Sequence, residues 1–362
     1  MSAQVTVVVM AGGTGGHVFP ALAVAERLRA LGHRVVWIGT PGGMEARLVP
    51  ARDFPIEWIS IGGLRGKNAL TLLLAPLRLL RAIAQALSIL RRLQPAAVIG
   101  LGGFASGPGG FAAWLLRRPL LIHEQNAIAC LTNRILARLA ARVLEAFPDT
   151  FTPSAKRLTV GNPVRSEIAA LPAPGLRFAQ RSGRARLLVI GGSLGALALN
   201  RCVPQALALL APGLRPEVWH QAGRTIEAAR GAYAQSGLAI EPQEFIDDMA
   251  AAYAWADLVV CRAGALTVAE LAAAGLPSVL VPFPFAVDDH QTANAAYLVS
   301  ADAAVLIQER DLTPARLAET LRVLLGDRNR LLQMAVAARG RAWPDARDRI
   351  VEECLSLAGA GA

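Results

Sequence analysis

The stretch Val7-Val8-Val9-Met10-Ala11-Gly12-Gly13-Thr14-Gly15-Gly16 decides the fold of this 362-residue chain. A short apolar run that ends in a cluster of glycines is typical of a buried parallel strand followed by a tight turn. A helix pattern follows the glycines, and the free N–H groups of a helix N-terminus attract anions. The stretch therefore predicts a strand, a ligand-binding loop and a helix, in that order.

A second stretch of the same form, Leu187-Leu188-Val189-Ile190-Gly191-Gly192-Ser193-Leu194-Gly195, follows about half a chain length later. Neither loop is a dinucleotide fingerprint, because Val18 stands where G-x-G-x-x-G requires its third glycine, and no Walker-type ATP motif occurs. Apolar runs that predict strands alternate with helical patterns in both halves. These runs cover residues 5–10, 35–38, 56–59, 97–101 and 120–122, then 187–190, 217–219, 258–261 and 278–281.

This rhythm predicts an α/β protein with two Rossmann-like domains, each a doubly wound parallel sheet, that face each other across a cleft. We expect the first domain to span residues 1–163 and the second residues 164–341. A terminal helix within residues 342–362 is expected to pack back on the first domain. For a single glycine loop, an ordinary strand-to-helix turn would be an equally good interpretation.

The net charge of +10 lies almost wholly between residues 60 and 145, which contain eleven Arg or Lys and two acidic residues. Residues 70–93 mix Leu and Ile with arginines, a composition that suits the interface of an anionic membrane. The alternative is an ordinary amphipathic helix with a solvated arginine face. Nucleic acid is not expected as a partner, because aromatic residues are not interleaved with the charge.

The chain shows no sign of a membrane span or a processed leader. No apolar run approaches the length that a membrane span requires, and the N-terminus lacks the basic region of a signal peptide. The four cysteines are scattered, which favours free buried thiols over zinc or disulfides.

Three segments of the first half place candidate functional residues where predicted strands end. They are residues 15–20 with His17, the glycine loop 102–110, and His123-Glu124-Gln125-Asn126. Ligands of open α/β sheets gather at the carboxyl ends of the strands, so these segments should meet in one site. A histidine there could bind phosphate or take a proton. Turn chemistry alone is the competing interpretation of each segment.

In the second half, residues 262–270 follow a predicted strand and open a helix whose first N–H groups could hold a diphosphate. Glu270 lies one turn inside, where its carboxylate could accept two hydrogen bonds from a ribose diol or simply stabilise the helix dipole. Residues 282–294 place further polar side chains at another strand end. Together these features predict a nucleotide or a nucleotide sugar as ligand.

Blocks spread over nearly the whole chain resemble, in the same order, those of the MurG family of peptidoglycan glycosyltransferases. They are residues 12–23, Gly62-Gly63-Leu64-Arg65-Gly66-Lys67, Ser106-Gly107-Pro108-Gly109-Gly110, residues 123–126, Gly161-Asn162-Pro163-Val164-Arg165, Glu244-Phe245-Ile246-Asp247-Asp248-Met249 and residues 264–270. The resemblance implies a two-domain GT-B fold, with a lipid acceptor on the first domain and UDP-N-acetylglucosamine (UDP-GlcNAc) on the second.

The resemblance also implies roles for individual residues. Ile246 would present its backbone to uracil, Glu270 would hold the ribose, and Gln291 would bind sugar hydroxyls. The diphosphate would meet Arg165, Ser193 and the turn at residues 265–267. The implied donor-binding set is Thr14, Gly15, Gly16, Asn126, Arg165, Ser193, Ile246, Ala265, Leu266, Thr267, Val268, Ala269, Glu270 and Gln291. The implied acceptor-binding set is His17, Gly103, Phe104, Ser106 and Gly107. Two departures from the family pattern are Leu194, where Gln is common, and Phe104, where Tyr is frequent.

The implied reaction is inverting transfer of N-acetylglucosamine to the C4 hydroxyl of lipid-linked N-acetylmuramyl-pentapeptide. His17 is the first candidate for the general base and Glu124 the second. No DxD-like pair occurs, so we expect neither a metal nor a cofactor. The expected location is peripheral, on the cytoplasmic face of the plasma (inner) membrane, and other cell-wall synthesis proteins are conceivable partners. The alternatives are a UDP-N-acetylglucosamine 2-epimerase of the same fold and a non-catalytic membrane or scaffold protein.

Overall fold

The computed structural model describes residues 4–62, 73–192 and 194–360. Two compact units emerge, Met1–Pro163 with Pro344–Ala362 and Val164–Trp343. Of the family block Gly62–Lys67, only Gly62 lies within the described residues. Ser193 lies outside them. No helix in the described part of the chain is long and apolar enough to cross a membrane.

The first unit contains a seven-stranded sheet in the order β3-β2-β1-β4-β5-β6-β7, and all neighbouring strands are parallel. Its strands are β1 (Thr6–Met10), β2 (Arg34–Gly39), β3 (Ile56–Trp58), β4 (Ala97–Gly100), β5 (Leu120–Glu124), β6 (Arg142–Glu145) and β7 (Arg157–Thr159). Its helices are α1 (Gly15–Ala30), α2 (Glu45–Leu48), η1 (Pro50–Arg52), α4 (Ala75–Leu93), α5 (Ser106–Leu115), α6 (Leu131–Leu139) and α16 (Ala346–Ala360).

Strand β1 shows why helices cover both faces of this sheet. Side chains alternate between the two faces of a strand, and every residue from Val7 to Met10 is fully buried. Val7 and Val9 join the core formed with α1 and α16, whereas Val8 and Met10 join the core formed with α4, α5 and α6. The C-terminal helix α16 also forms an ion pair with α1, because Arg27 Nε lies 2.6 Å from Asp348 Oδ1.

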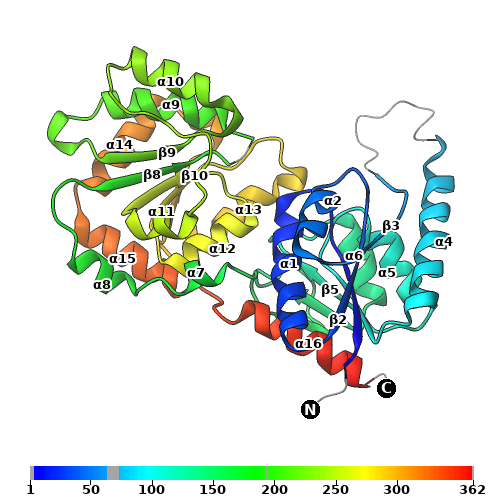
Figure 1. The fold of residues 1–362 in the computed structure, drawn as a ribbon. Coiled ribbons are helices and arrows are strands. Elements are labelled where there is room, and N and C mark those ends of the chain that lie inside the picture. The colour runs from blue at the N-terminus through cyan, green and yellow to red at the C-terminus, as the bar shows by residue number, and fades with distance from the viewer. Residues whose placement is uncertain (1–3, 63–72, 193, 361–362) are drawn as a thin grey trace. The chain divides into compact units, whose positions relative to one another are not determined.

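The second unit contains a five-stranded parallel sheet in the order β12-β11-β10-β8-β9. Figure 1 shows α9, α10 and α14 on one side of this sheet and α11 and α12 on the other. Its strands are β8 (Arg186–Ile190), β9 (Glu217–Gln221), β10 (Leu258–Cys261), β11 (Ser278–Leu280) and β12 (Ala304–Leu306). Its helices are α7 (Ser166–Ala169), α8 (Pro174–Ala179), α9 (Leu197–Ala208), η2 (Pro212–Leu214), η3 (Gly223–Thr225), α10 (Ile226–Gln235), α11 (Met249–Trp255), α12 (Ala265–Ala274), η4 (Val287–Asp289), α13 (His290–Val299), η5 (Glu309–Asp311), α14 (Pro314–Leu325) and α15 (Arg328–Arg339).

The predicted pair of doubly wound parallel sheets is confirmed, and so are the strands expected in each. The sequence missed β6, β7 and β12, which are only three or four residues long. Strands β6 and β7 also carry charged or polar residues that weaken the apolar signal, whereas β12 is apolar but too short to predict. The prediction that β5 ends at Ile122 was wrong, because the strand continues through Glu124. His123 and Glu124 are therefore buried strand residues rather than loop residues.

Candidate active site and donor-binding surface

In the first unit, the glycine loop between β1 and α1 is held by a buried carboxylate that sequence reasoning missed. Glu45, at the start of α2, is fully buried and accepts hydrogen bonds from Gly13 N (2.8 Å), Thr40 N (3.0 Å) and Thr40 Oγ1 (2.7 Å). The close approach needs glycine, because a Cβ on Gly12 would lie 2.3 Å from Glu45 Oε1. An isolated acid after Gly42 and Gly43 gives no sequence signal of this role.

The second glycine loop packs directly against the first. Gly102 and Gly103 have φ angles of +94° and +84°, which L side chains rarely adopt. A Cβ on Gly102 would lie 2.4 Å from His17 Nδ1, and one on Gly103 would lie 2.3 Å from the carbonyl oxygen of Gly12. Only glycine allows the loop after β4 to approach both the imidazole and the β1–α1 loop so closely.

His17 also reaches the third predicted segment, so the three segments meet as the sequence predicted. Its Nδ1 lies 3.1 Å from Gln125 Oε1. The amide nitrogen of Gln125 lies 2.9 Å from the carbonyl oxygen of Leu101 and 3.1 Å from His123 Nδ1, and His123 Nε2 lies 2.9 Å from the carbonyl oxygen of Gly161. His17 is half-buried, whereas Gln125 and His123 are buried. Burial lowers the pKa of His123 to about 4.

The carboxylate of Glu124, the second candidate base, accepts hydrogen bonds from the loop and helix that follow it. Its carboxylate is buried and accepts from Asn126 N (3.1 Å), Asn126 Nδ2 (3.2 Å), Cys130 N (3.1 Å) and Asn133 Nδ2 (2.9 Å). A carboxylate with four donors around it and no exposed edge is poorly placed to meet a substrate hydroxyl. It instead holds the backbone and side chain of Asn126.

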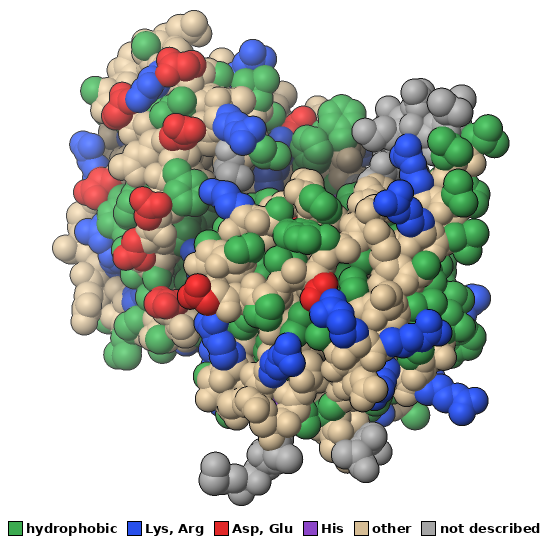
Figure 2. Space-filling model, turned by 45° about the vertical axis from the view of Figure 1, so that its right-hand side comes forward, with side chains coloured by type: hydrophobic (Ala, Val, Ile, Leu, Met, Phe, Trp, Pro, Cys, Tyr) green, Lys and Arg blue, Asp and Glu red, His purple; other side chains and the backbone are tan. Residues whose placement is uncertain are grey.

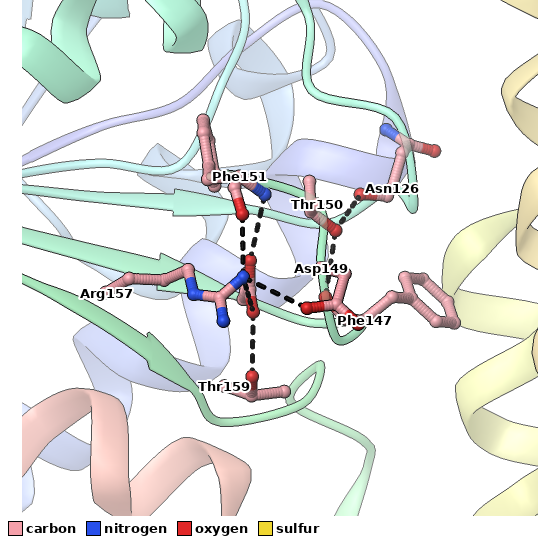
Figure 3. Close-up of polar contacts among 8 residues, drawn as sticks. Asn126, Phe147, Asp149, Thr150, Phe151, Arg157 and Thr159 are labelled. Carbon is pink, nitrogen blue, oxygen red and sulfur yellow. Dashed lines mark hydrogen bonds and ion pairs between the residues drawn. The ribbon is translucent and has the colours of Figure 1, made fainter. Parts of the chain in front are cut away.

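Asn126 is supported from its other side by the chain segment after β6. Thr150 Oγ1 lies 3.4 Å from the carbonyl oxygen of Asn126 and 2.9 Å from that of Phe147 (Figure 3). This segment is anchored by the fully buried Glu145, whose carboxylate accepts from Phe151 N (3.1 Å) and Thr159 Oγ1 (2.8 Å). A buried carboxylate on β6 thereby positions the predicted donor-binding residue through Thr150.

The remaining predicted acceptor-binding residues differ in how exposed they are. Phe104 is 49% exposed and Gly107 is partly exposed near the start of α5. Ser106 is fully buried, and its hydroxyl lies 2.8 Å from the carbonyl oxygen of Gly102 and 3.1 Å from that of Met10. These hydrogen bonds stabilise the glycine loop, and the contact of Ser106 with the acceptor stays a prediction.

In the second unit, the predicted diphosphate turn opens α12. Gly264 caps this helix in an extended conformation, and Ala265, Leu266 and Thr267 form its partly exposed first turn. The N–H groups of a first turn have no partners within the helix, so they are free to bind an anion. Val268 is fully buried and its N–H already donates to the carbonyl of Gly264, whereas Ala269 is partly exposed.

Glu270 lies in a pre-formed hydrogen-bond cluster that the sequence did not reveal. Its Oε1 accepts from Arg165 Nε (3.2 Å) and Nη2 (2.9 Å), and its Oε2 accepts from the hydroxyl of Tyr253 (3.0 Å). Burial raises the pKa of the Glu270 carboxyl, and the charge and hydrogen bonds of Arg165 oppose that shift. Burial also raises the pKa of Tyr253 well above its usual range, so its hydroxyl stays a donor.

A pocket of about 530 Å³ lies in the second unit beside the glycine loop that follows β8. Leu194, Leu197, Arg201, Arg262, Phe283 and Gln291 are among the residues that line it. Gln291 Oε1 accepts from Phe283 N (2.9 Å), which fixes the orientation of its side-chain amide. Ile246 lies outside this pocket and is buried, in the segment that leads into α11.

Within the described residues, no group of three or more His, Cys, Asp or Glu side chains could hold a metal ion. Each of the two adjacent acid pairs, Asp247-Asp248 and Asp288-Asp289, includes a carboxylate that accepts a hydrogen bond within its own segment. Asp248 Oδ1 accepts from Ala251 N (2.9 Å) as the cap of α11, and Asp289 Oδ1 accepts from Thr292 Oγ1 (2.7 Å).

Comparisons with known proteins cover nearly the whole chain. The model of the glycosyltransferase family 28 N-terminal domain matches residues 7–145, and that of the C-terminal domain matches residues 186–350. A protein of Nitrosococcus oceani named UDP-N-acetylglucosamine--N-acetylmuramyl-(pentapeptide) pyrophosphoryl-undecaprenol N-acetylglucosamine transferase is 60% identical over 98% of this chain and 99% of its own. A protein of Marinobacter nauticus with the same name is 57% identical over 96% of each chain.

Solved structures give the same result for the fold. The crystal structure of MurG from Acinetobacter baumannii is 44% identical, with a TM-score of 0.86 over 98% of this chain and 100% of its own. The glycosyltransferase of kitacinnamycin, at 17% identity and a TM-score of 0.70 over 98% of this chain and 100% of its own, shares the fold alone. These matches confirm the predicted GT-B fold.

Proposed function

Since this chain belongs to glycosyltransferase family 28, we propose how its two units divide the work of sugar transfer. The enzyme transfers N-acetylglucosamine from UDP-GlcNAc to lipid-linked N-acetylmuramyl-pentapeptide. A UDP-N-acetylglucosamine 2-epimerase is not favoured, because relatives that are 54–60% identical along the whole chain are named as transferases. What remains to be proposed is the role of each residue.

The second unit binds the donor. The first turn of α12 supplies N–H groups for the diphosphate, and Glu270 binds the ribose diol. Oε2 of Glu270 accepts one hydrogen bond in the structure, from Tyr253, so it can accept a second from a ribose hydroxyl. Arg165 is half-exposed and can turn from Glu270 toward the diphosphate. Gln291 binds sugar hydroxyls with its amide, Ile246 presents its backbone to uracil, and Ser193 stays a sequence-based expectation for the diphosphate.

Replacing Glu270 by alanine should weaken UDP binding by ~1–3 kcal/mol, because charge-assisted hydrogen bonds to the diol are lost. Calorimetric titration with UDP measures this change. The matched control is Glu241→Ala, since Glu241 is also paired with an arginine of the second unit, Arg230, but lies on an exposed surface. Equal UDP affinities for the two folded variants would remove Glu270 from the donor site.

The first unit binds the acceptor and supplies the base. The observation that carries this proposal is the convergence of His17, two glycine loops and Gln125 at one edge of the sheet. Gly103, Phe104 and Gly107 would contact the acceptor. Thr14, Gly15, Gly16 and Asn126 would contact the donor from this unit.

In the reaction, His17 takes the proton of the C4 hydroxyl while that oxygen forms a bond to C1 of N-acetylglucosamine. The bond from C1 to the diphosphate oxygen breaks, and its electron pair leaves with UDP. Attack opposite the leaving group inverts the configuration at C1. The N-terminus of α12 and Arg165 stabilise the charge that develops on the diphosphate. Transfer of labelled sugar from UDP-GlcNAc to the lipid-linked acceptor tests the assignment. Inversion predicts a β-linked product, and an α-linked product would contradict it.

We also propose that the first unit binds the cytoplasmic face of the plasma (inner) membrane peripherally. The start of α4 supports this, because Leu77 is 65% exposed, Leu80 is 63% exposed, and the exposed Arg78 and Arg81 lie between and beside them. Neighbouring helices also expose Trp114 and apolar residues of α6. Figure 2 shows this region, at the right of the view, as hydrophobic and basic side chains with few acids. Exposed apolar surface rimmed by arginines suits an anionic lipid interface.

The double variant Leu77→Ser/Leu80→Ser should sediment less with anionic vesicles than the unchanged protein. Binding of the unchanged protein should also weaken with salt, since each arginine near an anionic surface contributes ~1 kcal/mol. Leu176→Ser is the matched control, because Leu176 is equally exposed but belongs to the second unit. Equal binding of the unchanged protein to anionic and zwitterionic vesicles would mean that the charge is incidental. Unaltered binding by the double variant would place the lipid contact elsewhere.

A further inference from the structure

The side-chain amide of Gln125 joins two histidines of unequal exposure. Its oxygen faces His17 Nδ1 at 3.1 Å, and its nitrogen faces both Leu101 O at 2.9 Å and His123 Nδ1 at 3.1 Å. The carbonyl oxygen of Leu101 can only accept a hydrogen bond. The amide nitrogen of Gln125 must therefore point toward Leu101, which leaves the amide oxygen directed at His17.

At His123, the far end of this chain of hydrogen bonds, donor and acceptor are fixed by the chemistry of the partners. His123 Nε2 lies 2.9 Å from the carbonyl oxygen of Gly161, so this nitrogen carries a proton and donates it. Nδ1 of a neutral His123 is then an acceptor, and it accepts from the amide nitrogen of Gln125. Because burial lowers the pKa of His123 to about 4, its imidazole stays neutral near pH 7 and this direction persists.

The amide oxygen of Gln125 can only accept, so the nitrogen of His17 that faces it must carry a proton. A neutral imidazole has one N–H, and the hydrogen bond made by one ring nitrogen decides the state of the other. Resting on the proposed role of His17 as base, we propose that Gln125 is a positioning residue that holds neutral His17 as the Nδ1–H tautomer. The lone pair of His17 Nε2 then remains available to take the proton of the attacking hydroxyl.

The same arrangement suits the step itself. When Nε2 takes the proton, the imidazolium keeps its Nδ1–H hydrogen bond to the amide oxygen, which stabilises the new charge. Among the described residues, no carboxylate forms a hydrogen bond or an ion pair with the His17 ring. The carboxylate of Glu124 accepts hydrogen bonds from the N–H groups of Asn126 and Cys130. The carboxylate of Glu45 accepts from Gly13 N and from the hydroxyl of Thr40. His123, which is also titratable, is neutral. The opposite tautomer would direct a lone pair at the amide oxygen and leave a proton where the base is required.

The test is a long-range ¹H–¹⁵N correlation spectrum of the full chain labelled with ¹⁵N-histidine, at an alkaline pH where imidazoles are neutral. The chain has five histidines, and the signals of His17 are identified by their loss in His17→Gln. We expect the unchanged protein to show His17 protonated at Nδ1 alone. Protonation of His17 at Nε2 in the unchanged protein would overturn the proposal without any further variant.

Two variants separate positioning from a merely structural role. Gln125→Leu should mix the tautomers of His17 and lower kcat by ~10–10²-fold, less than loss of the base itself, with UDP affinity unchanged. Gln125→Glu still accepts from Nδ1–H, so it should keep the tautomer. Its carboxylate favours the charged imidazole, so the acidic limb of the pH–rate profile should move to higher pH. A structural role alone would impair both variants in parallel and leave the pH profile of each in place.

Tyr233→Phe is the matched control, because it removes a hydrogen-bond partner from another buried histidine, His220, in the second unit. It should change neither the His17 signals nor the pH profile. If His17→Ala keeps its kcat, the proposed base is wrong and the positioning role falls with it. If His17→Ala loses kcat but Gln125→Leu keeps both kcat and a single tautomer, only the positioning role of Gln125 is wrong.

Discussion

Replacing His17 by alanine is expected to lower kcat by ~10²–10⁴-fold and to leave the affinity for UDP nearly intact. The imidazole lies at the N-terminal end of α1, against Gly102 and Gln125, in the unit that we assign to the acceptor. In the proposed mechanism, its loss removes the group that takes the proton of the attacking hydroxyl, whereas the proposed donor contacts belong mainly to the second unit. Steady-state kinetics with varied acceptor, together with UDP titration, measure the two effects separately.

The pH profile gives this variant a second readout. A general base must be unprotonated, so the rate of the unchanged enzyme should fall as the pH decreases, and this acidic limb should vanish in His17→Ala. The matched control is His33→Ala, since His33 lies at the amino end of β2, the end opposite the site, and accepts from Val5 N. This control should keep its kcat. A loss confined to the KM for acceptor, with the pH profile preserved, would assign His17 to binding instead.

Replacing Gly103 by alanine is expected to lower the free energy of unfolding by about 2–6 kcal/mol and to abolish most of the activity. The backbone at Gly103 has a φ of +84°, and a Cβ there would lie 2.3 Å from Gly12 O and 2.6 Å from Gly12 N. Strain at a left-handed position and overpacking each cost about 1–3 kcal/mol. Because the clash involves backbone on both sides, it can be relieved only by separating the two glycine loops. Denaturant unfolding and transfer assays measure the two losses.

The matched control is Gly42→Ala, in the loop that precedes α2 of the same unit. Gly42 has no positive φ, and no atom lies within 4 Å of where its Cβ would be. This variant should stay within about 0.5 kcal/mol of the unchanged protein, as surface substitutions usually do. Equal stability of the Gly103 and Gly42 variants would show that the two loops do not need their close contact.

The architecture of this chain is largely readable from local patterns. The apolar run before Gly12 and its counterpart before Gly191 predicted a parallel strand in each unit, and strands β1 and β8 are present there. Such patterns are local, because burial of a parallel strand on both faces demands consecutive apolar residues. Short strands such as β12 were not predicted, since three apolar residues are too few to indicate a strand.

The chemistry of the individual site residues was not readable in the same way. The sequence ranked His17 ahead of Glu124 as the base but kept both as candidates, and only the tertiary structure shows that the Glu124 carboxylate is buried and accepts from four donors. Likewise, Gln125 was part of a recognised block, yet its sequence environment gave no indication of a link to His17.

By itself, the sequence determined the two parallel sheets, the loops at their carboxyl edges and the family of the enzyme. The tertiary structure alone decided which polar side chains are buried and which groups they form hydrogen bonds with. The contacts responsible join residues that are distant in the chain: Gly13 and Glu45 are 32 positions apart, Arg165 and Glu270 are 105 apart, and His17 and Gln125 are 108 apart. The periodic pattern of apolar residues depends only on residues that are close together in the sequence. A hydrogen bond between distant residues, and the tautomer or burial that it imposes, exists only once the sheet has brought the strand ends together.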